Sequence, residues 1–338
     1  MTRLIVTTDS SIAGAIQVAG LADIVIAIER RLVWGPMPSA AELDAFFAPR
    51  TTQPPGLHWL DDTPDWRLEQ WGVKDRGFTD LFAECEAFEF WRGPEPNAQL
   101  VLLWLLDHWR RGGTASASLM MRYSVLPIGD IDPRELAEPY PYPPVCEITP
   151  HDFKLASRAW RAYCAPTPQN WCSLFKWNLV AFPQLDHCVR DLLEELPAPA
   201  SGLGATEKRI LKRVARGGVQ PFDVFPRHQK PYEPFVYGYW EVGALLDGLA
   251  RGERPALSGL GEGPFSLDMH NDPDRFERYN RSRLSLTEFG KAVLAGEEDF
   301  RRYNSIDRWW GGTHLTNERL WRWDAETRSL AAPGSEGA

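Results

Sequence analysis

The sequence predicts an N-terminal α/β domain with a mainly parallel, Rossmann-like sheet, then a helical middle and a C-terminal α+β module of winged-helix character. Three observations support this. Two β-branched runs flank a helical segment within the first 28 residues, strand-like runs give way to helical ones after Thr149, and a basic amphipathic helix stands in the second half. A strand, a helix and a second strand in close succession are typical of a βαβ unit, whose strands are parallel.

The first strands are expected at Arg3–Thr7 and Asp23–Ile28, because both are continuous runs of apolar, mostly β-branched residues. Between them Ile12–Ala19 has helical spacing and ends at Gly20. The pattern predicts further strands at Ala87–Trp91 and Ser118–Leu126 and helices at Ala40–Ala48 and Ala98–Arg111, with residues 49–80 as a long irregular insertion holding one short helix.

The second half is mainly helical in its pattern. Residues 127–150 are rich in proline and tyrosine and predict an extended connection. Helices are expected at Thr149–Cys164, Asn170–Asn178, Phe182–Leu196, Thr206–Arg216, Tyr239–Arg251 and Thr287–Ala295, and strands at Arg281–Leu286 and Trp321–Trp323. We therefore expect a ligand-binding α/β domain over 1–130, a connection and helical linker over 131–200, a winged-helix-like domain over 201–328 and a disordered tail over 329–338.

Composition excludes several classes of protein. A chain of 338 residues exceeds the size at which a single core stops growing, and 43% hydrophobic residues is ordinary for a globular protein. No apolar run approaches the length of a membrane span, and the N-terminus lacks the apolar region of a signal peptide. The five cysteines form no C-x-x-C pair, which disfavours a disulfide framework or a cysteine zinc site. We therefore expect a cytoplasmic protein without a membrane partner.

Charge is unevenly distributed. Residues 1–199 hold 17 lysines and arginines against 26 aspartates and glutamates, whereas residues 200–338 hold 20 of each, so the net charge of −9 lies in the first part. Such a chain is a poor general binder of polyanions. The 15 tryptophans predict a tryptophan-rich core rather than a ring-stacking ligand site.

The first candidate site is the strand-to-helix turn at Asp9 and Ser10. Ligands of open α/β sheets bind beyond the carboxyl ends of strands, and free N–H groups at a helix start favour an anion. Asp9 would act as a base, metal ligand or ribose acceptor, and Ser10 as a second catalytic group. The ligand-binding residues would be Thr8, Ser11, Arg30 and Arg31. The alternative is that Asp9 or Ser10 only caps the helix.

The second candidate is Asp307 and Arg308, followed by Gly311, Gly312 and His314. An arginine–carboxylate pair near a histidine is able to bind an anion or to carry out acid–base chemistry. The alternative, which we favour, is a structural ion pair at a tight hairpin with His314 on the returning strand.

The third candidate is the basic helix Thr206–Arg216. In a winged-helix module it would present Lys208, Arg209, Lys212 and Arg213 to DNA. The alternative, again favoured, is a solvated basic face.

Signatures of established chemistry are missing from the sequence. It contains no G-x-G-x-x-G, Walker loop, G-x-S-x-G elbow or metal-ligand spacing of histidines and cysteines. No metal site is expected, the cofactor is not identified, and the sequence leaves open whether the protein is an enzyme.

Several segments together resemble a bacterial family classified as a domain of unknown function. They are Thr8–Gly14, Leu32–Pro36, Phe90–Gly93 with Gln99-Leu100, Gly202–Glu207, Leu286–Gly296, and Asp307–Gly312 with His314-Leu315. The resemblance covers most of the chain, and its C-terminal block is the most specific part. It implies the two-part architecture and marks candidate residues, but it implies no activity.

Three functional hypotheses follow. The leading one is binding of a small anionic or phosphorylated ligand at Asp9–Ser11, with transfer or hydrolysis at a phosphate or acyl group if the protein is an enzyme. Arg30, Arg31 or Arg308 would then hold the anion. The rivals are a ligand-sensing DNA-binding regulator and a protein-interaction module. The sequence does not predict an oligomeric state.

Overall fold

The chain folds into two compact units. The computed structural model describes residues 2–50, 58–112, 120–123, 146–226 and 236–334. The N-terminal unit comprises Met1–Leu32, Met37–Cys164 and Asn178–Cys188, and the C-terminal unit comprises Val33–Pro36, Ala165–Trp177 and Val189–Ala338. The segment 131–200, expected to be a separate linker, is thus divided between the two units.

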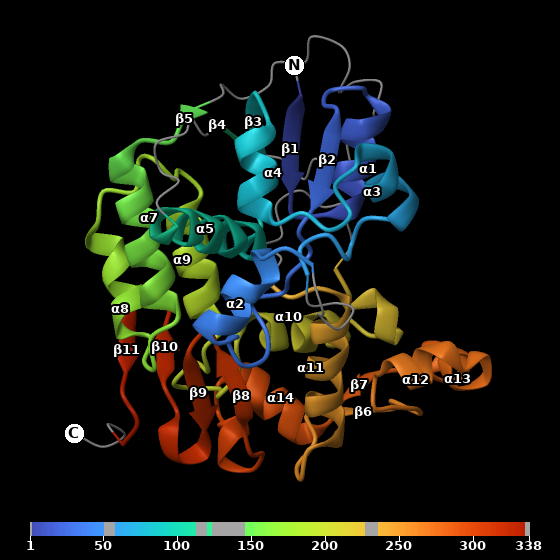
Figure 1. Ribbon diagram of the computed structural model, residues 1–338. Helices are drawn as coiled ribbons and strands as arrows, with labels where there is room; N and C mark the ends of the chain where they lie inside the picture. The colour runs from blue at the N-terminus through green and yellow to red at the C-terminus, as the bar shows by residue number, and fades with distance from the viewer. Residues whose placement is uncertain (1, 51–57, 113–119, 124–145, 227–235, 335–338) are drawn as a thin grey trace. The chain divides into compact units, whose positions relative to one another are not determined.

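A five-stranded, mostly parallel sheet forms the centre of the N-terminal unit (Figure 1). Its order is β2-β1-β3-β4-β5, and only β5 runs antiparallel to its neighbour. The strands are β1 (Arg3–Thr7), β2 (Ile24–Ala27), β3 (Ala87–Arg92), β4 (Met120–Tyr123) and β5 (Cys146–Glu147). The expected α/β sheet is therefore confirmed, and β1 has the predicted bounds.

Helices cover both faces of this sheet. On one face α1 (Ser10–Val18) packs Ile12 and Ile16 against Ile5 and Val25. On the other face Phe88 contacts aromatic rings of α4 (Phe78–Glu84) and α5 (Pro96–Arg111). The remaining helices are α2 (Ala40–Phe47), α3 (Asp65–Trp71) and α7 (Pro150–Tyr163), while α9 (Leu185–Glu194) contributes residues to both units.

Tryptophan fills the core, as the composition predicts. Trp59, Trp104 and Trp109 are fully buried among phenylalanine rings with centroid separations near 5 Å. Helix α5 is buried along most of its length and packs against α7, which explains why its sequence is apolar on all sides. The prediction for residues 49–80 was wrong in part, because α3 and the start of α4 lie there and the described part of the segment packs into this core.

The C-terminal unit combines helices with small antiparallel strand pairs. Helix α10 (Ala205–Val214) contacts α11 (Tyr239–Arg251) and α14 (Glu288–Ala295). The pairs are β6 (Leu257–Ser258) with β7 (Ser285–Leu286), β8 (Asp307–Trp310) with β9 (Thr313–Thr316), and β10 (Arg322–Asp324) with β11 (Ser329–Ala331). Short helices are α8 (Gln169–Cys172), α12 (Leu267–Asn271) and α13 (Pro273–Arg281), with single 3₁₀ turns at Ser173–Lys176, Pro221–Asp223, Phe300–Arg302 and Asn317–Arg319.

The predicted tail needs correction at its start. Ser329–Ala331 was expected to be disordered, yet it forms β11 because its backbone pairs with β10 in an antiparallel ladder. Leu330 pairs with Trp323, which is buried.

Two glycines of α11 provide a matched test of this packing. Gly248 has open space around it, so Gly248→Ala is expected to stabilise the protein by about 0.5–1 kcal/mol through helix propensity. At Gly243 a Cβ would lie 2.1 Å from Phe265 Cδ1, inside a packed aromatic cluster, so Gly243→Ala is expected to destabilise by roughly 1–3 kcal/mol. Urea unfolding of both variants measures these changes, and equal effects at the two positions would contradict the packing.

Candidate functional site

At the Asp9 turn the protein's own carboxylates accept N–H groups at the helix start. The Asp9 side chain caps α1 by accepting the Ile12 N–H at 3.0 Å, and Glu29 accepts the Ser10 N–H at 2.6 Å. An added anion would meet two acidic side chains here. Thr8 is half-buried, whereas Ser11 is exposed, as are Asp9 and Ser10.

The two predicted arginines follow β2. Arg30 is half-buried, with its guanidinium 5.7 Å from the Phe46 ring centroid, and Arg31 is exposed. Anion binding at this turn stays a prediction.

The β8–β9 hairpin separates the members of the second candidate site. Adjacent residues of a strand point to opposite faces, so Asp307 and Arg308 do not pair. Asp307 Oδ1 lies 2.5 Å from His314 Nε2, and the Trp309 ring stacks on His314 with centroids 4.5 Å apart. Arg308 is largely buried on the other face. The expected hairpin is present, with His314 on the returning strand, but the expected ion pair was wrong, because Asp307 contacts His314 and Arg308 lies near Glu207.

Arg308 belongs to a buried ionic cluster at the start of α10. Glu207 accepts a hydrogen bond from Arg301 at 2.5 Å and lies 3.9 Å from Arg308. Arg308 also donates to the backbone oxygen of Glu195 at 3.0 Å, and the Glu195 carboxylate accepts the N–H and hydroxyl of Thr206. These bonds tie the chain before α10 to the hairpin region and fix where the helix begins.

The two buried glutamates have pKa shifts of opposite direction. Burial raises the pKa of Glu195 to about 7, although Thr206 and Arg308 oppose the rise. Burial also raises the pKa of Glu207, but the neighbouring guanidinium groups of Arg301 and Arg308 outweigh it and bring that pKa below its usual value. At neutral pH Glu207 is therefore ionised, while Glu195 retains a proton in a large fraction of molecules.

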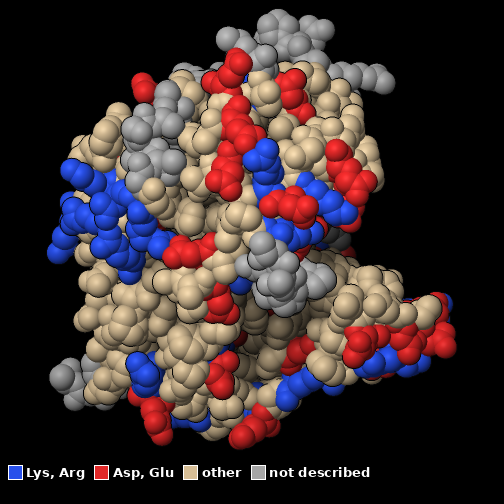
Figure 2. Space-filling view, in the orientation of Figure 1, with Lys and Arg blue, Asp and Glu red and all other residues tan. Residues whose placement is uncertain are grey.

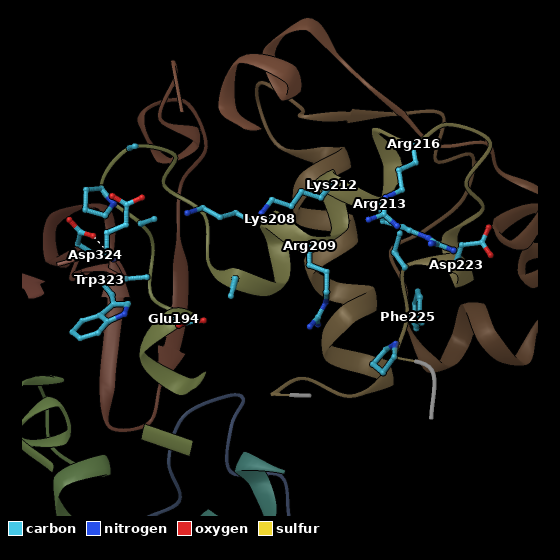
Figure 3. Close-up of a pocket in the computed structure, with 18 residues that line it drawn as sticks. Glu194, Lys208, Arg209, Lys212, Arg213, Arg216, Asp223, Phe225, Trp323 and Asp324 are labelled. Atoms are coloured by element: carbon cyan, nitrogen blue, oxygen red, sulfur yellow. Dashed lines mark hydrogen bonds between the residues drawn. The ribbon is translucent and has the colours of Figure 1, made fainter. Parts of the chain in front are cut away.

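A groove of about 720 Å³ runs along the outer face of α10 (Figure 3). Its cationic residues are all on or next to this helix: Lys208, Arg209, Lys212, Arg213 and Arg216. Its acidic residues are Glu194, Asp223, Asp324 and Glu326, and its aromatic ones are Phe225 and Trp323. Of these, only the basic helix was singled out from the sequence as a site.

Four of these cations form no salt bridge with any residue that the structure describes: Lys208, Lys212, Arg213 and Arg216. Burial and the nearby charge of Lys212 lower the pKa of Lys208, against the attraction of Glu194 and Asp324. An anion in the groove would relieve this repulsion.

A second cationic patch lies on α7 of the N-terminal unit. Lys154, Arg158 and Arg161 are exposed along one face of the helix, and Figure 2 shows blue side chains gathered over this region. This patch belongs to the N-terminal unit and shares no residue with the groove, so it provides a contrast to it.

Within the described ranges no three histidine, cysteine, aspartate or glutamate side chains are arranged to hold a metal ion. None of the helices in the described part has the length and apolar character that crossing a membrane requires. Comparison of the chain with protein-family models and with curated proteins gave no match.

The opposite shifts of the two glutamates predict opposite effects of substitution. Between pH 4.5 and about 7 the unfolded chain releases a proton that folded Glu195 keeps, so this group stabilises the fold less as pH rises. Glu195→Gln should therefore gain stability relative to the parent from pH 5 to pH 8, by up to about 3 kcal/mol. Thermal unfolding across this range measures the difference.

Glu207→Gln is the matched control. It leaves Arg301 and Arg308 buried without their carboxylate and should destabilise the protein at neutral pH by about 3–5 kcal/mol. Because the pKa of Glu207 is lowered, its stabilising contribution is lost as pH falls through that pKa, so the deficit of the variant should shrink in acid. If the stability of the two variants relative to the parent protein changed with pH in the same way, the charge states assigned to Glu195 and Glu207 would be contradicted.

Proposed function

We propose that the protein binds a small phosphorylated ligand in the groove along α10. The observation that carries this proposal is the row of cations at Lys208, Lys212, Arg213 and Arg216, none of which has a salt bridge within the described residues, in a cavity of the size that small-molecule sites have. The groove wall is fixed by the buried cluster of Glu195 and Glu207, so its cations are pre-arranged.

This proposal keeps the anionic ligand of the leading hypothesis but moves its site. At the Asp9 turn the carboxylates of Asp9 and Glu29 already accept helix N–H groups, and they would repel a phosphate. The groove also has carboxylates, among them Asp223 on the side of Arg213, but within the described residues none of them forms a salt bridge with Lys208, Lys212, Arg213 or Arg216.

The N-terminal sheet supports a second candidate site. We interpret it as Rossmann-like, because β2 and β3 lie on opposite sides of β1 and the strand order reverses there. Ligands of such sheets bind at this reversal, next to the carboxyl end of β1, which is where Thr8–Ser11 lie. The acidic surroundings favour a ligand with hydroxyl or amino donors over a phosphate.

The C-terminal unit also supports a winged-helix interpretation. Helix α10 is followed by Val219, which pairs with Leu284, then by a 3₁₀ turn, α11 and the β6–β7 ladder. In this arrangement α11 would enter a DNA major groove. Its charged residues are Glu241, Asp247 and Arg251, and the last two pair with each other.

Three of the four arginines of the corresponding wing, between β6 and β7, are also paired, and Arg283 is exposed. Arg275 and Arg278 contact Glu262, and Arg281 contacts Glu277. Uncompensated cations therefore favour a small anion on α10 over duplex DNA on α11 and the wing.

Tripolyphosphate is the probe for the groove. Lys212→Gln and Arg213→Gln should each weaken its binding roughly fivefold, because one partly exposed ionic contact contributes up to about 1 kcal/mol. Isothermal titration calorimetry at low ionic strength measures the affinity.

Two further variants locate the site. Lys154→Gln makes the same change of charge on α7 and should leave the affinity unaltered. Loss of binding in Ser10→Ala, with Lys212→Gln unaffected, would place the anion at the Asp9 turn and overturn the proposal.

A further inference from the structure

The groove along α10 is divided into two zones of different chemistry. Figure 3 shows Glu194, Trp323 and Asp324 together at one end, and Arg213 and Arg216 toward the other, with Lys208 and Lys212 between them. One end therefore offers carboxylates and an indole, and the rest offers mainly cations, with Asp223 as an acidic residue on the side of Arg213 and Arg216.

We infer that the ligand is a nucleoside polyphosphate, with its phosphates along α10 and its ribose and base at the end formed by Glu194, Trp323 and Asp324. This inference rests on the proposed function, since it names the ligand class of the same groove.

The spacing of the cations fits a chain of phosphates. Lys208 and Arg216 are eight residues apart, which is roughly 12 Å along a helix. Lys212 and Arg213 lie between them. A single phosphate would contact only a few of these side chains, whereas consecutive phosphates would reach cations on successive turns.

Trp323 supplies a donor that the protein itself does not use. Its side chain is buried, and its indole Nε1 has no hydrogen-bond partner among the described residues, although the residue lines the groove. The Phe175 ring stacks beside it with centroids 6.2 Å apart and fixes the indole. A buried N–H without an acceptor costs free energy, so a ring nitrogen or sugar oxygen placed here would give the indole N–H a hydrogen bond without displacing a protein partner.

The carboxylates select against a bare polyphosphate. Asp324 accepts the N–H groups of Glu326 and Thr327, which lower its pKa and keep it ionised. An ionised carboxylate repels a phosphate but accepts hydrogen bonds from ribose hydroxyls, as acidic residues do in dinucleotide sites. Tripolyphosphate would use the cationic zone alone, whereas a nucleotide would use both.

The test compares ATP with tripolyphosphate by calorimetry at constant ionic strength. The parent protein should bind ATP at least tenfold more tightly. Trp323→Phe keeps an aromatic ring beside Phe175 but removes the N–H, so it should weaken ATP binding roughly two- to tenfold and leave tripolyphosphate unchanged. Glu194→Gln, at a residue that lines the same end of the groove, tests that end independently of the Trp323 packing. Lys212→Gln should weaken both ligands by the same factor.

The outcomes separate the two proposals. Equal affinity for ATP and tripolyphosphate overturns the nucleotide inference and leaves the anion groove in place. The inference is also overturned if Trp323→Phe abolishes the binding of both ATP and tripolyphosphate. It is overturned as well if the affinity for ATP is unchanged in both Trp323→Phe and Glu194→Gln. If neither ligand binds the parent protein, the proposed function itself fails. Tighter, steeply salt-dependent binding of a short DNA duplex that Lys212→Gln abolishes would assign the cations to nucleic acid instead.

Discussion

The pairing of Glu207 with Arg301 and Arg308 is the contact on which the C-terminal unit depends. It joins the first turn of α10 to a 3₁₀ turn and to strand β8, which lie about a hundred residues further along the chain. Buried charges are costly to remove from water, so this arrangement is stable only while all three side chains are in place. Because α10 carries the cations of the groove, a structural ion cluster determines where the wall of that groove lies.

The sequence predicted the bounds of helices and strands best where one physical signal dominates. Strand β1 and helix α11 have their expected bounds, since the first is a continuous buried run and the second an amphipathic segment between glycines. Helices α12 and α13 were missed although Ser266 and Asp272 cap them and Pro273 opens the second. Their sequence is strongly charged and short, and few of their side chains are buried, so periodicity gave no sign of them.

Only the wall of the candidate site that α10 forms could be predicted from the sequence. The cations of α10 are close in sequence and share a helix face, whereas Trp323 and Asp324 come from a strand more than a hundred residues away. Conversely, Asp307 and Arg308 are neighbours in sequence, yet strand alternation sends one to solvent and the other into the interior. Glu194 and Glu195 show the same contrast, since the first lines the groove and the second is buried beneath α10.

The net charge of the second half of the chain gave no indication of how charge is distributed in the groove along α10. Residues 200–338 are neutral as a whole, which argued against a DNA-binding module, but in the groove most cations lie along α10, away from Glu194 and Asp324, with Asp223 as the acidic exception. Lys208 shows the consequence, because its lowered pKa reflects burial and the charge of Lys212 more than the attraction of Glu194 and Asp324. A ligand that is negative at one end and rich in hydrogen-bond donors at the other complements both zones, and a ligand of uniform charge complements only one.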